Sequence, residues 1–358
     1  MKVSSKTKLL LIPAVLGPAL AIPAASAAAA TNDSPNNKNA CSPRATAISF
    51  SDGLDKAVVG GVTVGGLSDM AWDKRRHAWA STVDNHGSDP ARVWFWRDPS
   101  NPKIVGGPLV LKRPDGTPYD GLTADNEGLA VLPDGDYLVS SEAEPSLRVF
   151  GRDGVQKSTL PVPARFAVTP AGQAGPNATL EGLTITPRGD RIIAAMEGAL
   201  SGDTDATLHR FLVYDKDRSG RWSLTKQTLY RAEPGLRVAE VAAYGRDSLL
   251  VLEAAFDPAK GNSVSLYGVG SFSRTPDVSK VADAAGRPAV GKTLVADLVK
   301  CPTLGAVAKE PQANPLMDNY EGMAVVPGRH GHTVHVISDD NFGAAQITRV
   351  LTLSARLP

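Results

Sequence analysis

The chain has 358 residues, of which 42% are hydrophobic and 21% are charged. This composition is ordinary for a globular protein and excludes a disordered chain or a coiled coil. The 38 basic and 37 acidic residues leave a formal net charge of +1. A chain without a bulk positive field is not built for nucleic acid, so we expect no nucleic-acid partner. The 34 glycines and 27 prolines indicate frequent turns.

The N-terminus has the pattern of a secretory signal peptide. Three lysines precede an apolar run over residues 9–22, and Ala25-Ser26-Ala27 offers a small-residue cleavage site. A membrane anchor is disfavoured, because the run is too short to span a bilayer and prolines interrupt it. We therefore predict a secreted, extracellular protein with no membrane span. Its expected organisation is a signal peptide over 1–27, a flexible leader over 28–44 and one β-domain over 45–358.

The chain contains two cysteines, Cys41 and Cys301. In an exported protein two cysteines are most simply one disulfide, and two buried free thiols are the alternative. We favour the disulfide, which would close a very long loop. It would tie the beginning of the mature chain to its last third.

Five segments of the chain resemble one another. Each has an acid, then mostly a glycine and an apolar residue, and runs through a Pro/Gly turn into a second apolar stretch. The five acids are Asp69, Glu127, Glu181, Glu240 and Glu321. Short apolar runs around such turns predict β-hairpins rather than helices. The hairpins recur every ~55 residues, with one longer interval before Glu321.

A repeated hairpin with room for two more strands is typical of a β-propeller. We predict an all-β propeller of five units, although the longer interval before Glu321 leaves room for a sixth. The last unit lacks a fourth strand before the chain ends. Residues 45–50, from the other end of the chain, are expected to supply it and to close the ring without a free edge.

The second strand of each hairpin also ends in an acid. These second acids are Asp84, Glu142, Glu197, Glu253 and Asp339. In every hairpin the two acids are centred on the turn, so they should lie side by side across the antiparallel strands. Because the first strand of each blade lines the central channel, five carboxylate pairs are expected to converge on one mouth.

Such a cluster of carboxylates should recruit a cation or raise the pKa values of its own members. Oxygen ligands favour Ca²⁺ or Mg²⁺ over zinc, so we expect a divalent cation, Ca²⁺ first and Mg²⁺ as the alternative. The expected ligands are Glu127, Glu181, Glu240, Glu321, Asp339, Asp340 and Asn341. The competing interpretation is that these acids bind backbone N–H groups or arginines and set the geometry of the blades.

Other motifs support few alternatives. His86, beside Asp84, is the histidine best placed for acid–base or metal chemistry, although a loop hydrogen bond is the plainer role. No Gly-x-Ser-x-Gly, His-Glu-x-x-His or Cys-x-x-Cys motif occurs, which disfavours serine esterases, zinc proteases and thiol redox enzymes. Four tryptophans gather in the first unit, where they fit core packing or a sugar or lipid platform: Trp72, Trp79, Trp94 and Trp96.

Two motifs near the C-terminus resemble a known family. Asn319-Tyr320-Glu321-Gly322-Met323-Ala324, followed by Ser338-Asp339-Asp340-Asn341-Phe342, is similar to the C-terminal signature of the phytase-like family. Proteins of this family are often described by an esterase-like activity of phytase. The resemblance extends over about 45–358 and includes Asp125-Asn126-Glu127-Gly128 and Glu181-Gly182-Leu183-Thr184. The first unit departs from it, with Asp69 where the family usually has glycine.

The resemblance implies a secreted, metal-assisted hydrolase of phosphoesters, with phytate as the nominal substrate class and a monomeric chain. On this hypothesis Glu181 or Glu321 is the general base, with Glu127 and His86 as further catalytic candidates. The basic residues expected to hold phosphate are Arg148, Arg237 and Arg349. The competing class is a non-catalytic extracellular propeller, a binding platform with a structural cation.

Overall fold

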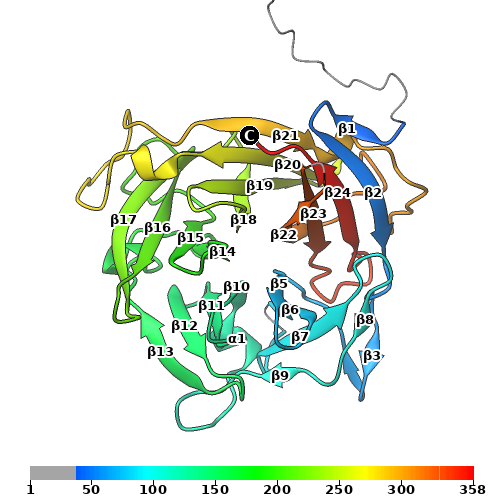
Figure 1. Cartoon of the computed structure of the whole chain (residues 1–358), viewed down its shortest axis with the longest axis horizontal. Helices are drawn as coiled ribbons and strands as arrows, with labels where there is room; N and C mark the ends of the chain where they lie inside the picture. The colour runs from blue at the N-terminus through cyan, green and yellow to red at the C-terminus, as the bar shows by residue number, and fades with distance from the viewer. Residues whose placement is uncertain (1–37, 85, 330) are drawn as a thin grey trace, which may run out of the picture. The chain divides into compact units, whose positions relative to one another are not determined.

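The computed structural model describes residues 38–84, 86–329 and 331–358. They form five antiparallel sheets arranged as blades around a common axis (Figure 1). The prediction of an all-β propeller is confirmed, and the number of blades is five. No helix within the described residues is long and apolar enough to cross a membrane. The predicted signal peptide and the leader up to residue 37 lie outside the described residues.

The first three blades follow one another along the chain. Blade 1 consists of β5 (Ala71–Asp73), β6 (Ala78–Thr82), β7 (Arg92–Arg97) and β8 (Lys103–Ile104), with β9 (Leu109–Val110) also paired to β7. Blade 2 consists of β10 (Asn126–Val131), β11 (Tyr137–Ser141), β12 (Ser146–Phe150) and β13 (Gln156–Leu160). Blade 3 consists of β14 (Leu180–Ile185), β15 (Arg191–Met196), β16 (Leu208–Lys216) and β17 (Trp222–Arg231).

The last two blades complete the ring. Blade 4 consists of β18 (Arg237–Ala243), β19 (Ser248–Asp257), β20 (Gly261–Gly270) and β21 (Lys292–Asp297). Blade 5 consists of β22 (Tyr320–Gly328), β23 (Gly331–Ser338), β24 (Val350–Ala355), β2 (Ala45–Ser51) and β1 (Ala40–Ser42). Short elements fill the connections: the β3 (Val58–Val59) and β4 (Val62–Thr63) hairpin, α1 (Gly121–Ala124), and 3₁₀ turns at Ala164–Phe166, Phe272–Arg274 and Leu298–Lys300.

The N-terminal strand closes the ring as predicted. β2 pairs with β24, so one sheet contains both ends of the described chain. The fold begins earlier than the predicted leader allows, because residues 40–42 form β1 on the outside of β2. Cys41 on β1 forms a disulfide with Cys301, which follows β21 of blade 4. A cross-link that closes a loop this long stabilises the folded chain by about 3–5 kcal/mol.

The hydrophobic core is divided among the spaces between neighbouring blades. Apolar side chains of blades 1 and 2 form one cluster, which includes Phe95 and Tyr137. Similar clusters lie between the other neighbouring pairs, and Trp79, Trp94 and Trp96 fill the one between blades 5 and 1. Core packing is therefore the role of these three tryptophans. Trp72 differs, because 43% of its surface is exposed.

The inner strands approach one another too closely for side chains at three positions. A Cβ atom on Gly128 would lie 2.4 Å from the Leu183 Cβ, and one on Gly182 would lie 2.8 Å from the Val241 nitrogen. A Cβ on Gly322 would lie 2.7 Å from the Asp69 Cα. The glycine after the acid in the repeat is therefore required by the convergence of inner strands from neighbouring blades.

The predicted register of the acids is wrong by two residues. Each inner strand from blade 2 to blade 5 has a register shift near its acid, as between Asn126 and Leu129. The Glu142 N–H consequently donates to the Asp125 carbonyl, so Glu142 lies opposite Asp125 instead of Glu127. A β-bulge adds a residue to one strand only, and counting from the turn does not reveal it.

Candidate functional site

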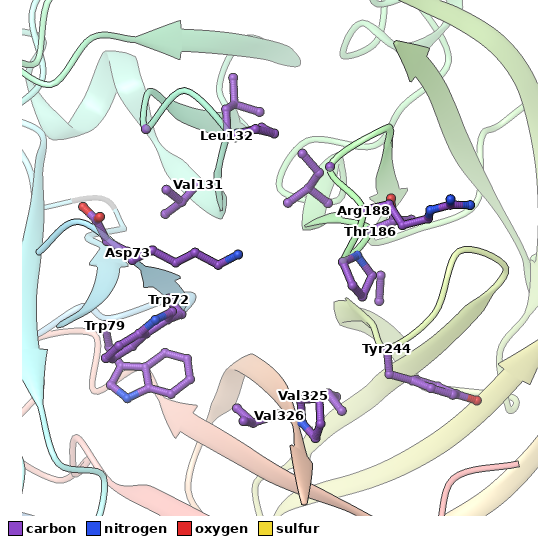
Figure 2. Close-up of a pocket in the computed structure, with 18 of the residues that line it drawn as sticks. Trp72, Asp73, Trp79, Val131, Leu132, Thr186, Arg188, Tyr244, Val325 and Val326 are labelled. Carbon is purple, nitrogen blue, oxygen red and sulfur yellow. The ribbon is translucent and has the colours of Figure 1, made fainter. Parts of the chain in front are cut away.

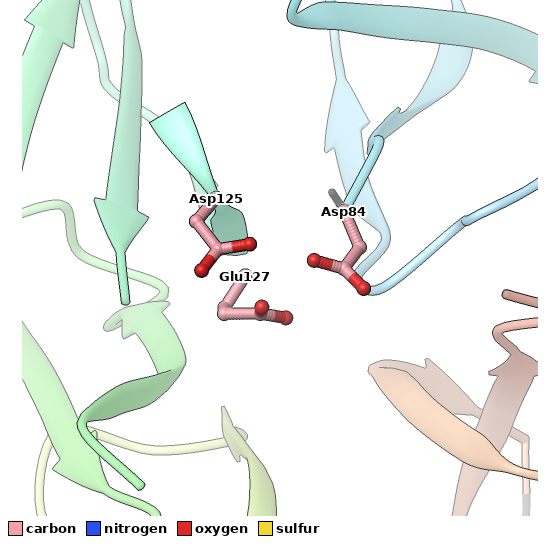
Figure 3. Close-up of side chains that lie close together, drawn as sticks. All are labelled: Asp84, Asp125 and Glu127. Atoms are coloured by element: carbon pink, nitrogen blue, oxygen red, sulfur yellow. The ribbon is translucent and has the colours of Figure 1, made fainter. Parts of the chain in front are cut away.

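Carboxylates gather where the inner strands begin. Asp84, Asp125 and Glu127 offer oxygen atoms that all lie within 4.8 Å of one another (Figure 3). A second group with the same spacing adds Glu142 and Glu181 to Glu127. Glu127, Glu142 and Glu181 are buried, and Asp84 and Asp125 are half-buried. These five residues, the acidic mouth, come from three consecutive blades. The predicted convergence of acids is therefore present across blades 1 to 3.

The acidic mouth is short of positive charge. Burial raises the pKa of Glu127 well above its ordinary value, and the nearby charges of Asp84, Glu181 and Glu321 raise it further. Burial also raises the pKa of Glu142 to about 7. Buried carboxylates that repel one another in this way retain protons or bind a cation.

Arg237 supplies positive charge on one side of the mouth. Its guanidinium at the start of β18 lies 2.9 Å from the Glu181 carboxylate, 3.0 Å from Glu197 and 2.7 Å from Glu321. The Asn319 side-chain carbonyl accepts a further hydrogen bond from it at 3.2 Å. The three carboxylates raise the pKa of Arg237 above its ordinary value, so it stays charged. Blades 3, 4 and 5 are thus joined by one cation with three anions.

Asp339 brings blade 5 into the same electrostatic field. Its carboxyl group is fully buried, and burial, Glu321 and Asp84 raise its pKa well above the ordinary value. One oxygen accepts the Asn341 N–H at 2.6 Å, whereas Oδ2 has no hydrogen-bond partner among the described residues. A buried carboxylate oxygen without a partner is costly unless a ligand or a proton satisfies it.

The neighbouring residues of the predicted ligand set point elsewhere. The buried carboxylate of Asp340 pairs with Lys56, and its other oxygen accepts the Gly66 N–H at 2.8 Å. These contacts fix the loop before blade 1, so Asp340 is not brought to the acidic mouth. Asn341 is exposed and adopts a positive φ of 43° in the turn after β23.

Asp69 and Glu240 form a separate layer within the ring. Their side chains are hydrogen-bonded to each other and fully buried, and neither belongs to the acidic mouth. Backbone N–H groups of all five blades donate to the pair: those of Met70, Leu129 and Met323 to Asp69, and those of Leu183 and Val241 to Glu240. The pair therefore ties the inner strands together, which is the competing role that the sequence left open for such acids.

This pair should hold one proton at neutral pH. Burial raises the pKa of Asp69 to about 7, and burial together with the Asp69 charge raises the pKa of Glu240 well above its ordinary value. The protonated Glu240 then donates to the Asp69 carboxylate. Because both pKa values are raised on folding, the stabilisation is complete below about pH 4 and is lost as pH rises through the folded-state values.

We expect Glu240→Gln to be tolerated, since the glutamine amide replaces the protonated carboxyl as donor to Asp69. Its melting temperature should match that of the wild type near pH 5 and exceed it near pH 9, where the wild type loses the proton. Thermal melting between pH 5 and 9 measures this, with Glu144→Gln, whose side chain is 85% exposed, as the control. Equal pH dependence of both variants would contradict the shared proton.

A comparison with known proteins agrees with the motifs. The family described as "Phytase-like: Esterase-like activity of phytase" matches residues 62–342, which is most of the chain. The chain belongs to the phytase-like family. No curated protein matches it.

Similar solved structures share little sequence with this phytase-like chain. They include a protein of unknown function from Dyadobacter fermentans, with 10% identity, a TM-score of 0.41, and coverage of 87% of this chain and 98% of that one. Another is hydrazine synthase from Kuenenia stuttgartiensis, with 12% identity, a TM-score of 0.38, and coverage of 79% and 81%. A third is aldose sugar dehydrogenase from Streptomyces coelicolor, with 13% identity, a TM-score of 0.37, and coverage of 81% and 80%. Likenesses this distant carry no argument about function.

The remaining predicted site residues of the phytase-like chain lie away from the acidic carboxylates. His86 accepts or donates a hydrogen bond to Asp89 at 2.9 Å and stacks on Phe342 with ring centroids 3.6 Å apart. Arg148 is buried on β12, with its guanidinium over the Tyr119 ring. These contacts are those of a loop histidine and a packing arginine.

Arg349 is also part of the fold and not of the mouth. Its fully buried guanidinium lies 2.7 Å from the Asp52 carboxylate and donates to the backbone carbonyls of Pro315 and Val307. It therefore fixes the loops around blade 5. Of the three arginines predicted to hold phosphate, Arg237 alone lies among the clustered acids.

Four residues of the cluster were not among the predicted ligands. Asp84, Glu142 and Glu197 were recognised as second-strand acids, and Asp125 was noticed only as part of the family motif. The spacing Asp125-x-Glu127 is the signal that could have identified it, because a bulge between the two lets both side chains reach one mouth. Glu253, the corresponding acid of blade 4, lies apart and pairs with Lys292 at 2.6 Å.

Proposed function

We propose that this phytase-like propeller is an extracellular hydrolase of phosphoesters that works at the acidic mouth with a divalent cation. The observation that carries the proposal is the close grouping of Asp84, Asp125 and Glu127, whose oxygen atoms lie within 4.8 Å of one another. The family match supports a hydrolase, and the disulfide fits an extracellular location. Residues 1–27 would act as the signal peptide, and the protein would act as a monomer.

The residues present fit a hard cation. All donors of the acidic mouth are carboxylate oxygens, which suit Ca²⁺ or Mg²⁺ and not a softer metal. The raised pKa of Glu127 and the partnerless oxygen of Asp339 both indicate uncompensated negative charge. Asp84, Asp125 and Glu127 would hold the ion, with Glu142 and Glu181 beside them. We favour Ca²⁺, because it accepts many carboxylate ligands, and Mg²⁺ is the alternative.

When bound, such a cation supplies positive charge for phosphoryl oxygens and makes water more acidic. Glu181 is the best-placed general base, because it adjoins Glu127 and Glu142 and is held at 2.9 Å by Arg237. Arg237 is then a positioning residue, since its charge is shared among three carboxylates. Glu321 holds the other side of that guanidinium.

The experiment is an assay of the purified protein on phytate, a phosphomonoester, a phosphodiester and an acyl ester, with Ca²⁺, with Mg²⁺ and with a chelator. We expect phosphoester turnover that the chelator abolishes. Glu181→Gln should reduce kcat/KM by about 100-fold or more, because it removes the base and leaves the fold in place. Glu144→Gln, on the surface, is the matched control and should be unchanged. Absence of turnover on every substrate with either cation would overturn the hydrolase.

A specific observation favours a second candidate, a non-catalytic binding platform with a structural cation. Arg237 and the Asp69–Glu240 pair both join inner strands, so several of the acids contribute to the ring itself. On this reading Glu181→Gln and Glu321→Gln lower the melting temperature, and the wild type has no turnover. The hydrolase predicts the opposite: turnover in the wild type, and variants that lose activity while they keep their melting temperature.

A further inference from the structure

A cavity of about 690 Å³ lies at the opposite end of the ring from the acidic mouth (Figure 2). Its walls come from the turns of the inner hairpins, and we call it the turn-end cavity. They include Trp72, Trp79, Leu132, Ile185, Tyr244 and Val326. Neither the sequence analysis nor the proposed hydrolase gives this cavity a role.

The turn-end cavity is separate from the acidic mouth. Each inner strand runs from the mouth towards its turn, so the two sites lie at opposite ends of the same strands. A smaller cavity of about 170 Å³ continues from the turns, with Leu129, Leu183 and Met323 in its wall. The N–H groups of Leu129 and Leu183 meet the Asp69–Glu240 pair, which therefore lies between the two ends.

Most of the wall is apolar and aromatic. Trp72 is 43% exposed and packs edge-on against Trp79, with ring centroids 5.2 Å apart. Figure 2 shows both rings on one side, with Val325 and Val326 between them and Tyr244. Large aromatic surfaces in a concave site of this volume are typical of small-molecule pockets.

The charged groups of the wall favour an anion. Lys74, Arg75 and Arg188 line the cavity, and none of the three forms an ion pair within the described part of the chain. Asp73 is the one acid in the wall as far as the structure describes it. Its carboxylate is already satisfied by the Tyr137 hydroxyl at 2.7 Å and by the Arg75 N–H at 2.9 Å.

One polar atom of the wall also lacks a partner. The Nδ1 atom of His332 is buried and has no hydrogen-bond partner among the described residues. The ring lies against Tyr244, with centroids 5.3 Å apart. A ligand with a polar head group at this side of the cavity would satisfy it.

We propose that the turn-end cavity binds a small amphiphilic anion, with a ring or short chain as its apolar body and a carboxylate or sulfonate as its head group. The aromatic and aliphatic wall buries the body, and the uncompensated charges of Lys74 and Arg188 attract the head group. The volume of about 690 Å³ accommodates a ligand of this size. This site is independent of the proposed hydrolase.

The test uses 4-cyclohexylbutanoate as the probe and 4-cyclohexylbutan-1-ol as its neutral counterpart. Binding is followed by tryptophan fluorescence, since Trp72 and Trp79 line the cavity, and by calorimetry. We expect saturable binding of the carboxylate and at least tenfold weaker binding of the alcohol, about the worth of one charged hydrogen bond. Equal affinity for both probes, or no saturation by the carboxylate, would overturn the proposal.

Variants locate the site. Lys74→Gln combined with Arg188→Gln should weaken the carboxylate about tenfold and leave the alcohol unchanged. The matched control combines Lys103→Gln and Arg218→Gln, two exposed cations outside the cavity wall. Trp72→Ala should weaken both probes, because it removes apolar wall area. If the control pair weakens the carboxylate as much as the cavity pair does, the attraction is a general surface effect and the assignment fails.

Discussion

Arg237→Met is expected to lower the free energy of unfolding by about 3 kcal/mol. The guanidinium lies within 3.0 Å of Glu181, Glu197 and Glu321, and the variant leaves all three carboxylates buried without a counter-charge. Removing one partner of a buried ion pair costs about 3–5 kcal/mol. The lower end applies because 27% of the Arg237 side chain is exposed. Urea denaturation at pH 7.5 measures the difference.

The control for this variant is Arg246→Met. Arg246 pairs with Asp190 at 3.2 Å on the surface, where its side chain is 55% exposed, and such a pair is worth less than about 1 kcal/mol. Adding Glu321→Gln to Arg237→Met should restore part of the lost stability by removing one unpaired charge. If Arg237→Met costs no more than Arg246→Met, Arg237 does not hold the three blades together.

The architecture could be predicted because repetition is visible in a single sequence. Hairpins at Glu127, Glu181 and Glu321 share an acid, a glycine and a turn, and that pattern gives the blades, their order and the closure by β2. The glycines also have a physical reason, since the inner strands meet where a Cβ does not fit. Local pattern and global fold agree at these positions, which makes them readable.

The register of the acids could not be read in the same way. A bulge beside Glu127 shifts Glu142 onto Asp125, and the same shift recurs from blade 2 to blade 5. The acids of the inner strands are therefore divided between two layers, with Glu240 and Asp69 in the inner one. The extra acid that distinguishes blade 1 from the family pattern becomes a partner for Glu240.

The basic residues were the least predictable part of the site. Arg148 and Arg349 are both buried, one over the Tyr119 ring and the other against Asp52, and a sequence does not show which cations a fold will bury. Asp340 is a similar case, because its partner Lys56 lies far away in the chain. Long-range pairing decides the role of such residues, and it is set by tertiary packing.

Adding Ca²⁺ is expected to raise the melting temperature at pH 8 and to have little effect at pH 5. Burial raises the pKa of Glu127 well above its ordinary value and that of Glu142 to about 7. Raised values mean that the folded protein binds these protons more tightly, so their stabilisation is present at low pH and is lost as pH rises through about 7. A cation replaces the lost protons, and at a hundred times its Kd it stabilises the fold by about 2.7 kcal/mol.

The variant Glu127→Gln should remove most of this cation effect, since Glu127 belongs to both carboxylate groups of the acidic mouth. The variant itself should melt at a higher temperature than the wild type in the absence of the cation at pH 8, because it carries one fewer repelling charge. Glu144→Gln, from the exposed loop after β11, should respond to Ca²⁺ as the wild type does. Melting curves at pH 5 and pH 8, with Ca²⁺, with Mg²⁺ and with a chelator, distinguish these outcomes. A wild type that gains nothing from either cation at pH 8 would leave the carboxylates as holders of protons, and the cation-assisted hydrolase would lose its basis.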